Sequence, residues 1–381
     1  MKKIVGIIAV LAGLTSCVYP YNPEFEETSE DIIVFEGSIV AGGTSTFQFS
    51  KVSPLSNYYY SNKKVTGTAC VEDDAGSVYN PSSMEPSNKV SIPMEGAPMD
   101  RKYRMKAVVD DQVYFSDWLE PLAPPEIEAI SFMLSKDTIT VQVAATLNGG
   151  KQGTGYIGLT YDETWEFHAD FRGEYYLDTL SWEVVPDAYP NYWCWKSASS
   201  PGMILVNYTE MTGDRVVSYP FQAFSVYNNR NQKLYSINVK AITLSDKAFK
   251  YLSNLSSISN MNGSLFSPNP GEMPSNIRCD SDPGRHVEGY VFASQITSCR
   301  GFLDSRYYRP SGASTSVLFL PEPGESYREL YENGAYPVAF MRLPVPTDEG
   351  YQDVEDVFWG PIRCIDCVVA GGTTQKPDFW P

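Results

Sequence analysis

Ser45-Thr46-Phe47-Gln48-Phe49-Ser50-Lys51-Val52 alternates polar and apolar side chains, and this period of two is typical of a β-strand with one buried face. The preceding stretch from Ile32 to Val40 predicts another strand, and Ala41-Gly42-Gly43 between the two predicts a turn. Similar segments follow at short intervals and predict strands over residues 65–72, 89–93, 103–109 and 113–118. Residues 31–122 therefore predict a small β-sandwich of immunoglobulin-like or transthyretin-like type.

Pro121, Pro124 and Pro125 interrupt this pattern, and because proline cannot donate to a sheet ladder, they predict a domain boundary. Beyond it, residues 126–381 predict a larger β-rich domain with long loops. Its expected strands cover residues 127–134, 138–144, 156–161, 164–171, 175–184, 204–208, 234–244 and 289–294. After these, we expect mostly loop, with short strands near 317–320 and 338–343.

One helix is predicted near residues 245–258. Ser245 can cap its first turn, and Asp246 suits the positive end of the helix dipole. Ala248, Leu252 and Leu255 fall on one face. The fold class is therefore mainly β, with a single α-helix packed on a sheet.

The first residues combine Lys2 and Lys3, an apolar run from Ile4 to Leu14, and small residues before Cys17. This order predicts a secretory signal peptide over residues 1–16, and it resembles the lipobox of a bacterial lipoprotein. On that interpretation Cys17 is lipidated, and residues 17–30 form an acidic, proline-containing tether. The alternatives are an ordinary signal peptide with a stray cysteine, or an uncleaved anchor.

The charge balance excludes some partners. Lys and Arg number 29 against 46 Asp and Glu, which gives a net charge of −17. Such a chain lacks the clustered basic charge that nucleic acid requires, and anionic headgroups should repel it. Only two histidines occur, His168 and His286, which leaves little room for histidine-based metal or catalytic sites. We therefore expect no nucleic acid, no metal and no cofactor.

Besides Cys17, the chain carries an even number of cysteines, which suggests disulfides in an exported protein. The candidates are Cys70, Cys194, Cys279, Cys299, Cys364 and Cys367. Their connectivity stays open. Cys364 and Cys367 have the spacing of a redox motif, but the Val-Val-Ala-Gly-Gly sequence that follows does not start a helix. A structural disulfide is the favoured interpretation of this motif.

No motif predicts catalysis. The chain has no Gly-x-Ser-x-Gly elbow, and paired carboxylates cannot be recognised without geometry. Asp280-Ser281-Asp282 matches a calcium loop poorly and reads as a turn. Several acids predict a solvated loop: Asp348, Glu349, Asp353, Glu355 and Asp356. Aromatic groups at residues 58–60, 175–176 and 307–308 suit either sugar stacking or sheet packing.

Three segments carry a resemblance to a known family: Tyr192-Trp193-Cys194-Trp195; Asn276-Ile277 with Gly289-Tyr290-Val291-Phe292-Ala293-Ser294; and Cys364-Ile365-Asp366-Cys367 with Gly371-Gly372 and Lys376-Pro377-Asp378-Phe379-Trp380. Together with the lipobox and a first domain that opens on Val34-Phe35-Glu36-Gly37, they resemble a Bacteroidota lipoprotein family catalogued as domain of unknown function 4249. The resemblance covers essentially the whole mature chain. It implies genes beside TonB-dependent transporters and a place at the outer membrane, facing the cell exterior. It supplies no catalytic residues.

We therefore expect a lipid-anchored, non-catalytic binding or accessory subunit of a nutrient transporter, with a small ligand that the sequence does not identify. The alternatives are a surface hydrolase with a carboxylate-based site, and a structural or adhesive surface module.

Overall fold

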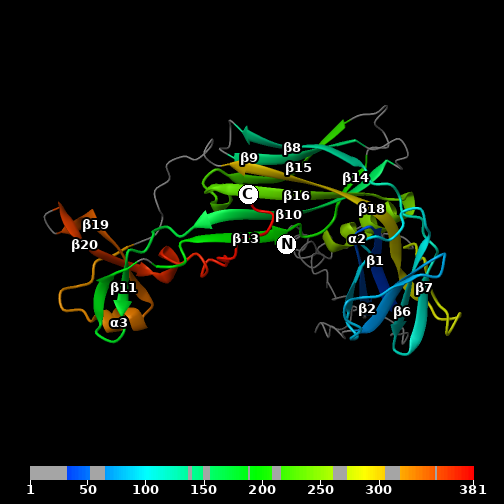
Figure 1. Cartoon of the computed structure of the whole chain (residues 1–381), viewed down its shortest axis with the longest axis horizontal. Helices are drawn as coiled ribbons and strands as arrows, with labels where there is room; N and C mark the ends of the chain where they lie inside the picture. Colours follow the sequence, from blue (N-terminus) through cyan, green and yellow to red (C-terminus); the bar gives the residue numbers. More distant parts are fainter. Residues whose placement is uncertain are drawn as a thin grey trace, which may run out of the picture.

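The computed structural model describes residues 32–51, 65–135, 140–148, 155–187, 189–207, 216–260, 273–304, 318–347 and 350–381. Cys17, the tether and the tyrosines at 58–60 and 307–308 lie outside these ranges. Among the described residues, no helix combines the length and hydropathy that a bilayer-spanning segment needs. Figure 1 shows three parts: a sandwich built from the first strands, a central sheet with a second sheet against it, and a small lobe that includes β11, α3, β19 and β20.

The predicted N-terminal sandwich is confirmed. One layer contains β1 (Ile33–Ala41), β2 (Thr44–Lys51) and β5 (Lys89–Pro93). The other contains β3 (Gly67–Asp73), β4 (Val78–Tyr79), β6 (Tyr103–Val109) and β7 (Gln112–Ser116). Alternate residues point inward, so that Phe35 and Tyr114 from opposite layers meet with ring centroids 4.8 Å apart.

The sandwich also uses chain from the predicted second domain. Strand β17 (Ile277–Cys279) pairs with β7, and β18 (Val287–Asp304) runs parallel to β1 over residues 287–295. The range predicted for the N-terminal sandwich, residues 31–122, therefore lacks two of its strands. Because strand pairing joins segments far apart in sequence, the proline-rich boundary could not reveal these two strands.

Strand β18 continues into the central sheet, where residues 296–304 pair antiparallel with β16 (Leu234–Thr243). β16 pairs with β10 (Tyr156–His168), and β10 pairs in turn with two short strands along its other edge, β13 (Trp193–Ser199) and β14 (Ile204–Asn207). One face of this sheet packs on a second sheet of β8 (Glu126–Ser135), β9 (Thr140–Asn148) and β15 (Val216–Ser225).

The predicted helix is confirmed as α2 (Asp246–Asn260). The Ser245 hydroxyl accepts a hydrogen bond from the Ala248 amide at 3.2 Å, as expected of a cap. Ala248 is fully buried, and Leu252 and Leu255 pack beside it against Ile242 of β16 and Phe292 of β18. The helix therefore covers one end of the sheet face that lies opposite β8, β9 and β15.

The small lobe has more regular structure than predicted, since strands were expected only over residues 175–184 and in short segments near 317–320 and 338–343, with loop elsewhere after residue 294. It contains β11 (Tyr175–Asp178), β12 (Glu183–Pro186), α3 (Tyr327–Glu332), and a long hairpin of β19 (Ala335–Thr347) and β20 (Gly350–Pro361). A short 3-10 turn, η3 (Ile362–Cys364), follows the hairpin, and a second one, η1 (Asn229–Asn231), precedes β16 in the central sheet. The short strand expected near 338–343 lies within β19, which is longer than predicted. Pro337, Pro344 and Pro346 are tolerated in it because β20 is its one strand partner among the described residues, so its outward edge needs no amide donors. Asp353, Glu355 and Asp356 accordingly lie exposed on β20 and not in a loop.

The parallel pairing of β1 with β18 depends on Gly289. Its φ is +113°, and a Cβ there would lie 1.9 Å from the Phe35 carbonyl oxygen. We predict that Gly289→Ala lowers the free energy of unfolding by at least about 3 kcal/mol, because strain and a backbone clash combine. Urea denaturation followed by tryptophan fluorescence measures the change.

Gly76→Ala is the matched control. Gly76 has a φ of +89°, but a Cβ added there would meet no atom within 4 Å, so only the conformational cost of about 1 kcal/mol remains. Equal losses of stability in the two variants would contradict the role assigned to Gly289.

Candidate functional site

The candidate site lies on the face of the central sheet that α2 partly covers. Even-numbered residues of β10 and β16 point to this face, and their odd-numbered neighbours point into the core with β8, β9 and β15. Between α2 at one end and the C-terminal residues at the other, polar side chains from β10, β16 and β18 lie in register. We call them the polar strip: Thr160, Asp162, Asn238, Lys240, Ser298 and Arg300.

The polar strip consists of two cross-sheet rows. Thr160, Lys240 and Ser298 are register partners in one row, and Asp162, Asn238 and Arg300 are partners in the next. All of them are at least partly exposed. Strands in a sheet are about 4.8 Å apart, so the side chains form a continuous polar surface.

Asp162 and Lys240 neutralise each other within the strip. The Lys240 Nζ lies 2.6 Å from Asp162 Oδ2, and the Ser199 hydroxyl donates to Asp162 Oδ1 at 2.7 Å. Burial raises the pKa of Asp162, but these hydrogen bonds outweigh burial and hold the pKa below its ordinary value. Asp162 is therefore an ion-paired carboxylate and is not poised as a general acid.

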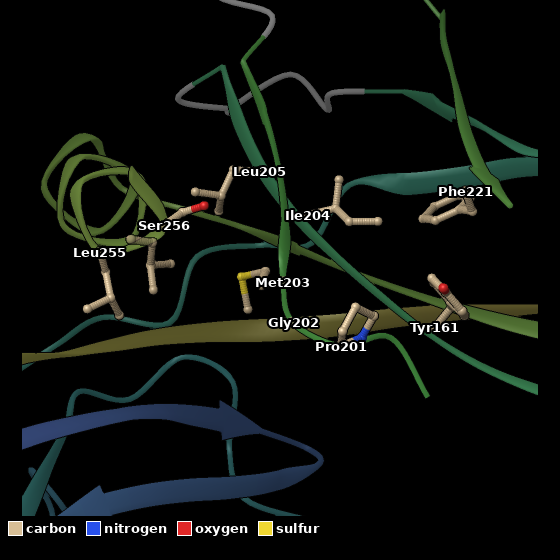
Figure 2. Close-up of a pocket in the computed structure, with 10 residues that line it drawn as sticks. Tyr161, Pro201, Gly202, Met203, Ile204, Leu205, Phe221, Leu255 and Ser256 are labelled. Carbon is tan, nitrogen blue, oxygen red and sulfur yellow. The ribbon is translucent and has the colours of Figure 1, made fainter. Parts of the chain in front are cut away.

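An apolar groove adjoins the strip beside α2 and along β14. It has a volume of about 670 Å³ and is lined mainly by Met203, Ile204, Leu205, Leu252 and Leu255, with Tyr161 and Phe221 at its far end. Figure 2 shows Met203 between Leu255 of α2 and the strand that carries Tyr161. None of the lining residues carries a carboxylate. The groove therefore suits binding of apolar groups.

Gly158 allows Met203 to reach the sheet. A Cβ at Gly158 would lie 2.4 Å from the Met203 sulfur and 3.1 Å from Ile242. The groove wall therefore depends on a glycine that the alternating pattern of β10 does not explain.

A buried ion pair lies behind the groove, between the two packed sheets. Glu163 is only 2% exposed. Arg230 binds it through two hydrogen bonds of 2.7 and 3.0 Å, and the Tyr235 hydroxyl donates to it at 3.0 Å. Arg230 also stacks on Trp165, 4.3 Å from the ring centroid. Every oxygen of Glu163 is thus engaged, and the network connects to the groove through Gln222 and Tyr161.

The far end of the sheet face is covered by the C-terminal hook, residues 365–381. A disulfide joins Cys367 to Cys194 of β13, and Trp195 and Thr373 exchange two backbone hydrogen bonds of 2.8 Å. The hook then crosses the face, where the Trp380 indole donates to Glu166 at 3.1 Å. The Arg300 guanidinium lies over Phe379, with its central carbon 3.7 Å from the centroid of the ring.

One disulfide is confirmed among the predicted candidates. Cys70, Cys279, Cys299 and Cys364 are free thiols in the structure. Cys279 belongs to the core of the N-terminal sandwich and Cys364 to the core of the small lobe, so these two cannot approach each other. The two cysteines of the Cys364–Cys367 motif likewise do not pair, because Cys367 bonds to Cys194.

The other residues singled out in the sequence lie apart from this site. His168 stacks on Tyr192 with centroids 5.0 Å apart, and Lys233 lies over Trp193. His286 contacts Glu288 at 2.7 Å on the surface.

The sequence Asp280-Ser281-Asp282 forms a turn, in which the Gly284 amide donates to the Asp282 carboxylate. Within the described ranges no three metal-binding side chains gather into a cluster. Tyr175 and Tyr176 lie on β11 in the small lobe.

The polar strip and the groove were not predicted from the sequence. Their residues come from β10, β14, β16, β18 and α2, and only the strand register brings them together. The alternation of β10 was a usable signal, because Thr160, Asp162 and Thr164 occupy one face without an apolar residue.

The family model Domain of unknown function (DUF4249) matches residues 18–300. The match includes the groove, α2 and the polar strip as far as Arg300. It ends before the β19–β20 hairpin and the C-terminal hook, which the resemblance noted in the sequence also included. No curated protein matches the chain.

We predict that Arg230→Met lowers the free energy of unfolding by about 3–5 kcal/mol, because it leaves the Glu163 carboxylate buried without its charge partner. The double variant Glu163→Gln with Arg230→Met should recover most of this loss. Urea denaturation of both variants gives the comparison.

Arg328→Met serves as the control for removal of an arginine. Arg328 pairs with Glu332 on an exposed helix surface, where ion pairs contribute little, so only a small change is expected. A double variant as unstable as Arg230→Met would contradict the argument from an uncompensated charge.

Proposed function

This chain belongs to the family of the Domain of unknown function (DUF4249), and on that premise we propose that it is an outer-membrane lipoprotein that binds a ligand as a non-catalytic accessory subunit of a TonB-dependent transporter. The observation that carries the binding role is the open apolar groove beside α2, with the polar strip next to it. Ligand sites are typically concave and mostly apolar, with a few polar groups at fixed positions.

The lipid anchor is proposed from the leader. A basic start, an apolar run and Cys17 follow one another in the order of a lipoprotein signal. Acyl chains contribute about 0.8 kcal/mol per buried methylene, so a multiply acylated cysteine can hold a folded body at a bilayer without a spanning helix. The acidic net charge argues for this covalent attachment over electrostatic binding to anionic lipid.

A carboxylate-based hydrolase receives less support from the site. Glu163 and Glu166 are the buried acids of β10, and they point to opposite faces of the sheet. Glu163 binds Arg230, and Glu166 binds Lys233 and Trp380. Two acids on opposite faces cannot flank one substrate bond, so we favour binding over hydrolysis.

Replacing Cys17 tests the anchor. We predict that Cys17→Ala moves the protein from the detergent-soluble membrane fraction to the aqueous fraction, because the acylation site is lost. Cys299→Ala, which removes a half-buried thiol, should stay in the membrane fraction. Intact-mass spectrometry of the native protein without an added lipid mass at residue 17 would contradict the proposal.

Charging the groove tests the binding role. We predict that Leu255→Asp weakens saturable binding of the neutral dye N-phenyl-1-naphthylamine at least tenfold, because a carboxylate in an apolar groove repels an apolar ligand. Leu180→Asp is the matched control, since Leu180 is 93% exposed at a hairpin tip of the small lobe. Dye fluorescence gives both affinities. Equal binding by the two variants would place the dye elsewhere.

The transporter partnership has its own test. A tagged native protein, purified from detergent-solubilised outer membrane, should retain a TonB-dependent transporter that mass spectrometry identifies. Recovery of the lipoprotein without any transporter would count against the accessory role but would leave the ligand site unaffected.

A further inference from the structure

Arg300 differs from several other arginines of this acidic protein, which form ion pairs. Arg104, Arg230 and Arg328 each lie within 3 Å of a carboxylate oxygen. In the part of the chain that the structure describes, Arg300 has no carboxylate within ion-pair distance. Its Nη1 donates to the Ser236 hydroxyl at 3.0 Å, and its guanidinium lies over Phe379. A fixed cation with unused donors is thus present on the polar strip.

Asp162, the acid nearest to Arg300 in the polar strip, does not neutralise its charge. Asp162 shares a row with Arg300, but Asn238 lies between them, and Lys240 and Ser199 occupy both Asp162 oxygens. Burial lowers the pKa of the Arg300 guanidinium, with Asp162 acting in the opposite direction. The group nevertheless stays charged at neutral pH, since free arginine titrates far above it. Its partial desolvation strengthens any interaction with an anion.

The groove and Arg300 lie at the two ends of one surface. Met203 continues β14 beside Thr160, and Arg300 is in register with Asp162. Three strand spacings of about 4.8 Å and two residue rises of about 3.3 Å separate them, which gives roughly 16 Å. Thr160 and the methylene stem of Lys240 lie between, and Ile296 adds a half-exposed apolar side chain beside α2.

We propose that the ligand of this site is a carboxylate-bearing amphiphile, whose apolar chain lies in the groove and whose carboxylate binds the Arg300 guanidinium. The proposal rests on the groove being the binding site of the proposed function. Charge complementarity favours this ligand class over a neutral lipid, because the guanidinium offers a planar pair of donors that matches a carboxylate. An extended chain of twelve carbons spans a distance comparable to that between Met203 and Arg300.

The test compares two probes on the full mature chain. Sodium dodecanoate and its uncharged ester, methyl dodecanoate, compete with N-phenyl-1-naphthylamine in a fluorescence displacement assay at low ionic strength. We expect dodecanoate to bind at least tenfold more tightly than the ester. Arg300→Gln should abolish this preference by weakening the binding of dodecanoate. Arg300→Lys keeps the positive charge but lacks the planar pair of donors, so it should retain part of the preference for dodecanoate.

Arg328→Gln is the matched control, because Arg328 also stacks on a ring, at 5.2 Å from Trp182, but lies in the small lobe. It should keep the full preference. Because Phe379 packs against Arg300, the urea concentration at the midpoint of unfolding is measured for the Arg300 variants. An unchanged midpoint shows that the C-terminal hook still packs on the sheet.

The outcomes separate the two proposals. If the ester displaces the dye but dodecanoate binds no better, or if Arg300→Gln keeps the preference, the carboxylate site is wrong and the groove remains. If neither probe displaces the dye, the groove does not bind acyl chains, and the proposed amphiphile ligand is wrong as well.

Discussion

The structure depends on one strand that belongs to two sheets. The first half of β18 pairs parallel with β1 and completes the N-terminal sandwich, and its second half pairs antiparallel with β16 in the central sheet. One layer of the sandwich and the central sheet therefore form one continuous eight-stranded sheet among the described residues. Because every backbone group of a buried strand needs a partner, β18 fixes the sandwich and the central sheet relative to each other. α2 packs against β18, and Ser298 and Arg300 of the polar strip belong to it, so this strand also holds the candidate site in place.

Local patterns predicted much of the fold. Alternation identified the strands of the sandwich, and Ser245 with the spacing of Ala248, Leu252 and Leu255 identified α2. Partner choice was not predictable, because a strand sequence specifies which residues are buried but not which strand lies beside it. The closing strands β17 and β18 were therefore assigned to another domain. The β19–β20 hairpin was predicted only in part, as a short strand near 338–343, for a different reason: its prolines are tolerated because one edge of β19 has no strand partner among the described residues.

The candidate site was predicted least well. No segment of the sequence contains it, since Thr160, Lys240 and Ser298 come from three strands and become neighbours only through register. The predicted candidates were local motifs, such as Cys364–Cys367 and Asp280–Asp282, and the structure gives them structural roles in a disulfide and a turn. A binding surface on a sheet face is formed by residues from several strands that are distant in the sequence, so searches for local motifs do not detect it.

Two arginines show how the same side chain serves structure and binding. Arg230 lies between packed sheets, where the cost of burying Glu163 is offset by two hydrogen bonds and by stacking on Trp165. Arg300 also stacks on an aromatic ring, but its side-chain partner is the neutral hydroxyl of Ser236. A hydroxyl leaves most of the charge of the guanidinium uncompensated. This difference between the two arginines is the reason why we propose that Arg300 binds a carboxylate from outside the chain.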